Sequence, residues 1–330
     1  MVGCLLGSID ALASDDDLIR LFQRVDNAGR WGPNDELGTL NFITPEKRRQ
    51  ASLLVREGRV LSLALPISGS DGTGQRFEHR MVGVVGAADD EVAFSVHQEN
   101  FTHLDCVSHI ASYDGFAYNR RRYDHAVTTE GVRLGSVQAQ AGGIFTRAVL
   151  LDLPAALGIS ALAPQMEFTP SHLGSAEAYA GVSVGSGDAV VVRTGAQTAG
   201  YPSVLRPGPG ARCIEWLYER EVALYTGDSP ERLTPLGAHV LGLPGEAGLA
   251  ATGSDAHSHA SEGNGAGTRF PLPFHQIAIP AMGLSLLDFC AVEELARTCA
   301  SLRRYEFLFV ALPLPIEGGT GSPVNPLAVF

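Results

Sequence analysis

The sequence is poor in basic residues, and this shortage excludes one broad class of function. Its 330 residues include 24 Lys and Arg against 36 Asp and Glu, which gives a formal net charge of −12. Binding to nucleic acid requires a basic surface that neutralises phosphates. We therefore expect neither DNA nor RNA among the partners of this chain.

Long hydrophobic runs and paired cysteines are also missing. No apolar stretch approaches the roughly 20 residues that cross a bilayer. The mildly apolar start, residues 1–8, has no basic region and soon meets the acidic residues 15–17, so no secretory signal is predicted. The five cysteines are an odd number without a CxxC pair, which argues against a disulfide framework. These absences predict a cytoplasmic protein with no membrane partner.

The composition of the chain is suited to a large hydrophobic core. Hydrophobic residues make up 45% of the chain, and we expect one domain over residues 1–330 with a mixed α/β fold. Short apolar runs predict strands at 60–66, 148–153, 189–193, 223–225 and 307–312. Helices are predicted at 14–26, after Thr44 and Pro45, at 211–220 and at 291–302. Residues 245–268 are rich in Gly, Ala and Ser and predict a flexible insertion.

The segment from His97 to His109 carries the clearest chemical signal. Its alternation predicts a strand over residues 96–105, followed by a helix from Asp105 that brings His109 one turn away. One face of that strand would carry His97, Glu99, Phe101, His103 and Asp105. Imidazoles and carboxylates are ligands for Zn²⁺ or Mn²⁺. Spacing alone leaves two readings open: a metal site with His109 as an adjacent base, or a hydrogen-bonded structural cluster at a helix start.

The same segment resembles the signature of the cyclase family of metal-dependent hydrolases. That signature reads His-x-Gly-Thr-His-x-Asp-x-Pro-x-His, and Thr102, His103, Asp105 and His109 match it. Glu99 stands where the family has its first histidine. A carboxylate is also a metal ligand, and His97 on the same predicted face is a second candidate for the vacant position.

Other stretches resemble the family in the same order along the chain. Residues 30–41 resemble the entry segment of its longer bacterial members, 187–195 a core strand, and 313–326 the closing segment. His275 matches a histidine of members with two metal ions, and Asp288 stands where those members have a glutamate. The resemblance implies the family's β/β/α arrangement, with a small barrel-like mixed sheet flanked by helices, assembled as a homodimer or homotetramer.

The resemblance also implies roles for individual residues. One or two divalent ions, Zn²⁺ or Mn²⁺, would be held by His103 and Asp105 together with Glu99 or His97. His275 and Asp288 would line the opposite wall or hold a second ion. The predicted catalytic residues are His109, as general base, and Thr102, which would hold the ligand strand or donate to a substrate oxygen. The predicted substrate-binding residues are Trp31, Phe101, Tyr118 and Asn119.

The function that these roles predict is hydrolysis of a small molecule. An ion would activate water for attack on an amide, lactam or lactone carbonyl, and His109 would take the proton and return it to the leaving group. The alternative is a ring-forming cyclase or dehydratase of secondary metabolism on the same scaffold, working with or without metal. A third hypothesis is a small-molecule binder that has lost the chemistry.

Overall fold

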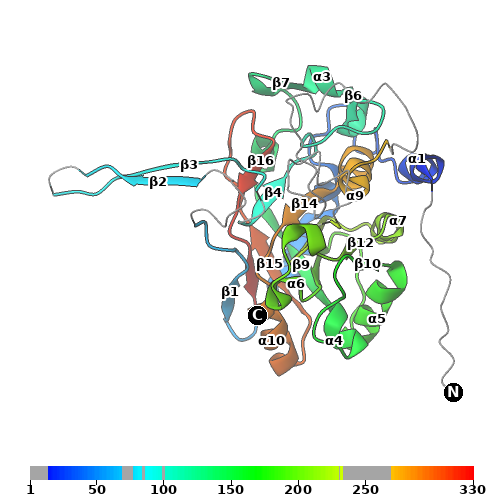
Figure 1. Cartoon of the computed structure of the whole chain (residues 1–330), viewed down its shortest axis with the longest axis vertical. Helices are drawn as coiled ribbons and strands as arrows, with labels where there is room; N and C mark the ends of the chain where they lie inside the picture. The colour runs from blue at the N-terminus through cyan, green and yellow to red at the C-terminus, as the bar shows by residue number, and fades with distance from the viewer. Residues whose placement is uncertain (1–13, 69–76, 84–85, 99–100, 230, 233–268) are drawn as a thin grey trace.

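One mixed sheet of nine strands organises the molecule (Figure 1). The computed structural model describes residues 14–68, 77–83, 86–98, 101–229, 231–232 and 269–330. In spatial order the strands are β1 (Val60–Ser62), β17 (Leu327–Val329), β15 (Glu306–Ala311), β9 (Ile144–Asp152), β11 (Ala189–Arg193), β13 (Leu224–Gly227), β14 (Ser285–Asp288), β4 (His103–Asp105) and β16 (Gly321–Pro323).

The centre of the sheet is parallel and its borders are antiparallel. Strands β9, β11, β13 and β14 run parallel, whereas β4 lies antiparallel between β14 and β16. Central strands are buried on both faces, which explains their continuous apolar sequence. In β11, for example, Val190 and Val192 belong to one core cluster, and Ala189 and Val191 belong to the other.

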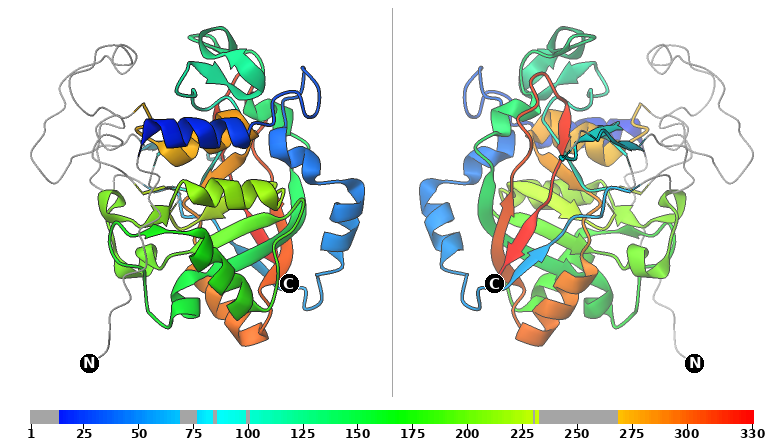
Figure 2. Two further views of the ribbon diagram at one scale, coloured as in Figure 1. Left: turned by 90° about the vertical axis from the view of Figure 1, so that its right-hand side faces the viewer. Right: turned by 90° about the vertical axis from the view of Figure 1, so that its left-hand side faces the viewer.

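Helices cover both faces of this curled sheet (Figure 2). One core cluster receives apolar side chains from α1 (Asp15–Arg24), α5 (Pro170–Ala180), α7 (Arg212–Glu219) and α9 (Pro273–Ile277). The other receives them from α10 (Glu293–Leu302). The other α-helices in the described part of the chain are α2 (Pro45–Ser52), α3 (Tyr123–Ala126), α4 (Leu153–Leu157) and α6 (Ala196–Ala199). Shorter helical segments are η1 (Gly38–Phe42), η2 (Tyr118–Arg120), η3 (Val137–Gln140), η4 (Ser203–Leu205) and the π-helical η5 (Ala278–Met282).

The predicted fold class is confirmed: the chain has a mixed α/β fold in which helices flank a barrel-like sheet. Local signals placed several elements correctly. The side chain of Ser14 caps α1 by accepting from the N–H of Asp17, and Thr44 caps α2 with Pro45 in its first turn. Among the described residues, no helix combines the length and hydrophobicity that a membrane span requires. The predicted insertion at 245–268 lies outside the described residues.

Within the described ranges, four two-stranded ribbons accompany the large sheet. One of them, formed by β2 (Phe77–Met81) and β3 (Asp90–Phe94), projects away from the body as an arm (Figure 1). Its strand residues are largely exposed, yet β3 leads directly toward His97. The other ribbons pair β5 (Phe116–Ala117) with β6 (Arg121–Arg122), β7 (Val127–Thr128) with β8 (Gly131–Val132), and β10 (Glu167–Phe168) with β12 (Gly208–Pro209).

A contact between two glycine backbones fixes the segment that leads into β14. The N–H of Thr39, in η1, donates to the carbonyl of Gly283, at the end of η5, at 2.9 Å. Gly38 has φ +57°, and a Cβ there would collide with the backbone of Gly283. Only glycine combines this left-handed conformation with so close an approach.

We expect Gly38→Ala to lower the free energy of unfolding by at least about 2 kcal/mol, because the methyl group forces two backbones apart. Gly29→Ala is the matched control: Gly29 also has a positive φ, of +76°, but a Cβ there meets open space. Its cost should be limited to about 1 kcal/mol for the left-handed conformation. Urea unfolding measures both, and equal losses would contradict the proposed close approach.

Candidate active site

The carboxylate of Asp105, at the end of β4, lies at the centre of a group of histidines. Its Oδ1 is 2.7 Å from Nδ1 of His97 and 3.7 Å from Nε2 of His103. Its Oδ2 is 3.7 Å from Nε2 of both His109 and His275. The Asp105 side chain is only 1% exposed. A carboxylate this deeply buried requires polar partners, and four imidazoles supply them.

The predicted strand over residues 96–105 is wrong, because β4 contains only His103–Asp105. The neighbouring strands set this limit. Asp288, opposite His103, ends β14, and Phe289 after it has φ +60°. On the other side Pro323 lies opposite His103 and has no N–H with which to extend the ladder. His97 therefore reaches Asp105 from a bend and not along a strand face.

The helix predicted to begin at Asp105 is also wrong. The chain forms a turn at residues 107–108, closed by a hydrogen bond from the N–H of His109 to the carbonyl of Cys106 at 3.0 Å. The N–H of Cys106 is bound by the carbonyl of Thr320, which ties this backbone to the segment before β16. The turn still brings His109 beside Asp105, so the predicted proximity is present with a different backbone.

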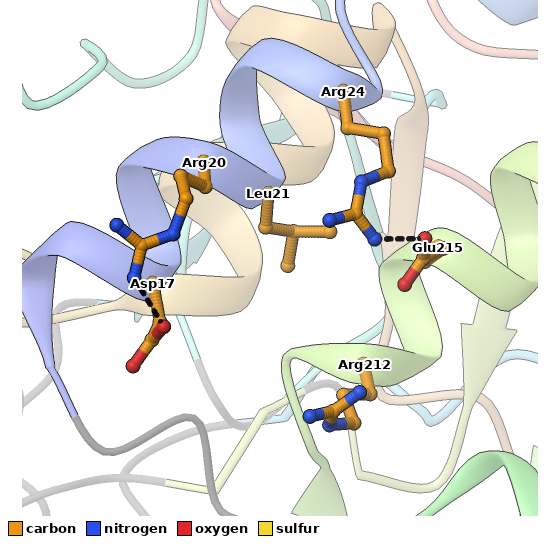
Figure 3. A pocket seen from close by; sticks show the side chains of 6 residues that line it. All are labelled: Asp17, Arg20, Leu21, Arg24, Arg212 and Glu215. Atoms are coloured by element: carbon orange, nitrogen blue, oxygen red, sulfur yellow. Dashed lines mark hydrogen bonds and ion pairs between the residues drawn. The ribbon is translucent and has the colours of Figure 1, made fainter.

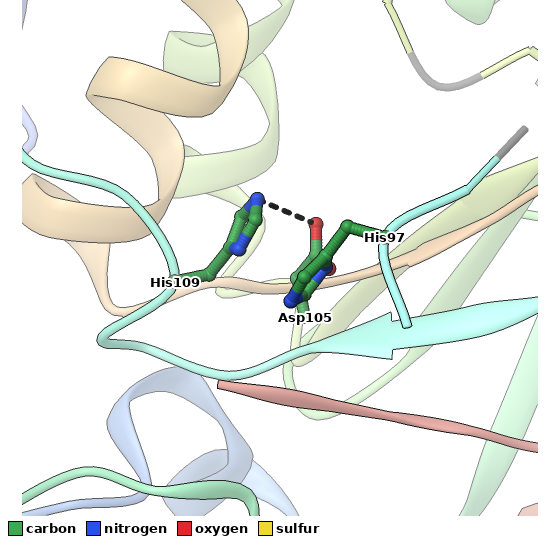
Figure 4. Close-up of side chains that lie close together, drawn as sticks. All are labelled: His97, Asp105 and His109. Atoms are coloured by element: carbon green, nitrogen blue, oxygen red, sulfur yellow. Dashed lines mark hydrogen bonds and ion pairs between the residues drawn. The ribbon is translucent and has the colours of Figure 1, made fainter. Parts of the chain in front are cut away.

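His97 and His109 stack on each other beside Asp105 (Figure 4). Their ring centroids are 3.9 Å apart and the rings are inclined by 28°. Burial lowers the pKa of His109 to about 3, although the charge of Asp105 opposes this. His109 is consequently neutral at pH 7. Burial alone would raise the pKa of Asp105. The nearby imidazoles, first His109 and then His97, have the larger opposite effect, and the pKa lies well below its ordinary range.

The second part of the site comes from α9 and from the end of β14, which lie far from β4 in the sequence. Nε2 of His275, on α9, lies 3.4 Å from Oδ2 of Asp288. Asp288 stands at the end of β14, in the strand next to β4, so this carboxylate reaches the cluster. Burial alone would lower the pKa of His275. Hydrogen bonds with Asp288 and Glu231 have the larger opposite effect, and the pKa lies well above its ordinary value.

Glu231 is a site residue that the sequence analysis missed. Its Oε2 lies 2.6 Å from Nδ1 of His275, and its side chain is 4% exposed. A signal for it existed, because Glu231 follows β13 and Asp288 ends β14. These strands are parallel neighbours, and the carboxyl ends of parallel strands meet at one edge of a sheet.

The donor set fits a divalent metal ion. His103, Asp105 and Asp288 offer ligand atoms within 4.8 Å of one another, as do His97, Asp105 and His109. Oδ1 of Asp288 is buried and has no hydrogen-bond partner within the described part of the chain. Imidazole nitrogens with carboxylate oxygens suit Zn²⁺ or Mn²⁺. The predicted ligand Glu99 lies outside the described residues.

Thr102, predicted as catalytic, uses its hydroxyl on backbone groups. The Oγ1 atom donates to the carbonyl of Phe289 at 2.7 Å and accepts from the N–H of Leu65 at 2.8 Å. The side chain is buried. This geometry matches the first of its two predicted roles, which was to hold the strand of the ligands. Donation to a substrate oxygen stays a prediction.

Thr102→Val should therefore lower the free energy of unfolding by about 2 kcal/mol, because a buried carbonyl and a part-buried N–H lose their partner. Thr102→Ser retains the hydroxyl and should cost clearly less. Guanidinium chloride unfolding of the two variants measures the difference. A valine variant as stable as the serine variant would show that these hydrogen bonds contribute nothing.

The four predicted substrate-binding residues lie in different surroundings. Phe101 is fully buried, with its ring centroid 5.9 Å from that of His103. Trp31 packs edge-on against Phe42. The hydroxyl of Tyr118 donates to Asp35, and Asn119 binds backbone groups of Gly29, Gly32 and Pro33. The structure thus brings Phe101 to the cluster, whereas the polar groups of Tyr118 and Asn119 hold the 29–35 segment.

A surface hollow of about 140 Å³ lies between α1 and α7 (Figure 3). Its lining residues are Asp17, Arg20, Leu21, Arg24, Arg212 and Glu215. Ion pairs join Arg20 to Asp17 and Arg24 to Glu215, so much of its charge is already neutralised. None of its lining residues belongs to the histidine cluster.

Comparisons with known proteins show which family the chain resembles. The family model "Cyclase: Putative cyclase" matches residues 38–231. The chain is similar to a crystal structure described as a novel cyclase, at 26% identity and a TM-score of 0.76, covering 93% of this chain and 100% of that one. It also shares the fold of an isatin hydrolase bound to the product analogue thioisatinate, at 18% identity and a TM-score of 0.51, covering 84% and 94%. No curated protein matches.

Proposed function

The chain belongs to the cyclase family, and from this premise we propose that it is a metal-dependent hydrolase that opens an amide, lactam or lactone bond of a small molecule. The observation that carries the proposal is the convergence of four imidazoles on Asp105, with Asp288 beside His275. The shared fold of an isatin hydrolase supports the choice of a cyclic amide among the substrates to test.

We assign the ion to His103, Asp105, His275 and Asp288. Nδ1 of His103 lies 3.2 Å from the carbonyl of Phe101, and Nδ1 of His275 faces a carboxylate. In metal sites a ligating histidine almost always donates from its other nitrogen in this way. His97 differs, because Asp105 and the hydroxyl of Thr320 engage both its nitrogens. A bound ion would polarise the substrate carbonyl and ease the ionisation of water.

His109 carries the proton. Its neutral imidazole accepts a proton from the attacking water, and Oδ2 of Asp105, 3.7 Å from Nε2, stabilises the positive charge that results. The same imidazolium then donates the proton to the leaving nitrogen or oxygen, which prevents reversal of the bond cleavage. His97, stacked on His109, holds the ring against Asp105.

The test begins with protein purified without a nickel column. We expect about one Zn²⁺ or Mn²⁺ per chain by elemental analysis, and turnover of a panel of lactams, N-acyl amides and lactones that a chelator abolishes. A metal-free protein that is active in ring closure would establish the cyclase alternative. Binding of panel compounds without any turnover would establish the non-catalytic binder.

We further propose that the working form is a homodimer or homotetramer. The exposed arm of β2 and β3 supports this proposal, because an isolated two-stranded ribbon is only marginally stable in water. Light scattering coupled to size-exclusion chromatography measures the mass. A mass equal to that of one chain at micromolar concentration would refute the proposal.

A further inference from the structure

Glu231 makes three contacts at one place in the fold. Its Oε1 accepts from the N–H of Phe274 at 2.7 Å. Its Oε2 accepts from the N–H of His275 at 3.3 Å and lies 2.6 Å from Nδ1 of the same residue. One carboxylate thus binds the first turn of α9 and the imidazole that this turn carries.

These contacts leave His275 little freedom. Because the same carboxylate binds the backbone N–H and Nδ1 of His275, the ring cannot rotate without breaking a charge-assisted hydrogen bond. With Nδ1 occupied by Glu231, Nε2 is the nitrogen that faces the cluster, 3.4 Å from Asp288 and 3.7 Å from Asp105. The carboxylate therefore fixes the direction of the ring and the nitrogen that faces the cluster.

We infer that Glu231 is the positioning residue that aims Nε2 of His275 at the metal ion. The inference rests on the proposed function for the ion, but it does not depend on which bond is cleaved. Glu231 need not touch the substrate or the ion. It acts through His275, as the second partner of a metal-bound histidine does.

The alternative is that Glu231 only stabilises the start of α9. The two roles separate in Glu231→Gln, which keeps the volume and one acceptor oxygen but supplies an amide NH₂ where the carboxylate accepted hydrogen bonds. With the NH₂ at the position of Oε1, the N–H of Phe274 faces a donor, and with the NH₂ at the position of Oε2, both donors of His275 do. In either orientation Nδ1 of His275 loses its charged partner. The matched control is Glu177→Gln, since Glu177 is also a largely buried carboxylate that binds a backbone N–H, that of Val184, and an arginine, Arg220.

The experiment titrates Zn²⁺ alone into metal-free protein in competition with a chromophoric chelator. Glu231→Gln should bind Zn²⁺ about 10- to 100-fold more weakly than the wild type, whereas Glu177→Gln should bind it equally well even if it is less stable. The ¹⁵N resonance of Nδ1 of His275 in the metal-free proteins should shift in Glu231→Gln, where this nitrogen loses its charged partner, and should not shift in Glu177→Gln. Unchanged affinity with an unchanged ring spectrum would overturn the inference.

A substitute variant and a comparison with wild-type hydrolase activity keep the result interpretable. If Glu231→Gln does not fold by circular dichroism, Glu231→Asp replaces it, and this shorter carboxylate should show a smaller loss of Zn²⁺ affinity. Both readouts are independent of turnover. A wild type without hydrolase activity, combined with weaker Zn²⁺ binding in Glu231→Gln, refutes the proposed reaction and supports the role of Glu231. If the wild type binds no Zn²⁺, there is no ion for Nε2 of His275 to face, and the inference is overturned together with the proposed ion site.

Discussion

Replacing His109 by asparagine is expected to reduce kcat/KM for hydrolysis by about 100- to 10,000-fold, the usual contribution of a general acid–base group. Asparagine keeps a polar group of similar reach beside Asp105 but cannot accept the proton of the attacking water. Metal content should not change, because the proposed ligands are other residues. Steady-state kinetics on the best substrate of the panel, together with elemental analysis of the same sample, measure both effects.

The matched control for this variant is His125→Asn. His125 is a largely exposed histidine whose nearest acidic group is Asp124, at 4.0 Å. Its replacement should leave kcat/KM within about twofold of the wild type, as expected for a surface substitution away from the site. Full activity in His109→Asn would assign the proton transfer to another group, for which the stacked His97 is the structural candidate.

The second large effect is expected for Asp105→Asn. This change removes the carboxylate on which all four imidazoles converge. Metal affinity should fall by more than the ~10- to 100-fold that follows loss of a supporting partner, because Asp105 is a proposed ligand itself. Hydrolysis should become undetectable even when Zn²⁺ or Mn²⁺ is added. Metal titration of the folded variant and the panel assay measure the two losses.

Asp152→Asn serves as the control for a buried carboxylate. Asp152 caps α4 and pairs with Arg193 at 2.9 Å, so the variant should lose stability and keep its metal. The assignment of Asp105 would fail if Asp105→Asn retained a stoichiometric ion of wild-type affinity. In that case the remaining carboxylates, those of Asp288 and Glu231, would have to hold the ion.

Much of the fold was predictable because its signals are local. Ser14 and Thr44 cap helices through contacts three residues away, and the bounds of β11 follow from its continuous apolar run. The prediction of a long strand before Asp105 was wrong because neighbours in space decide where β4 ends. Phe289 and Pro323 lie far away in the sequence, and no pattern within residues 96–105 reports their positions.

The same distinction between local signals and distant contacts applies to the residues of the site. His97, His103, Asp105 and His109 were found together because they lie within one short segment. Glu231 acts only through a histidine that lies 44 residues further along the chain, so it carries no local motif. Asp288 was predicted only through resemblance, and the antiparallel pairing of β14 with β4 brings it to His103.

The position of β4 also has a consequence for how the protein matures. This short strand lies between β14 and β16, which come from the last part of the chain. Such distant pairings close large loops and form slowly. The nascent chain therefore contains the histidines of the first segment long before their counterparts on α9 and β14 exist. If the proposed ion site is right, capture of the ion would be a late event in folding, and a loaded centre would report that β4 and β14 have paired.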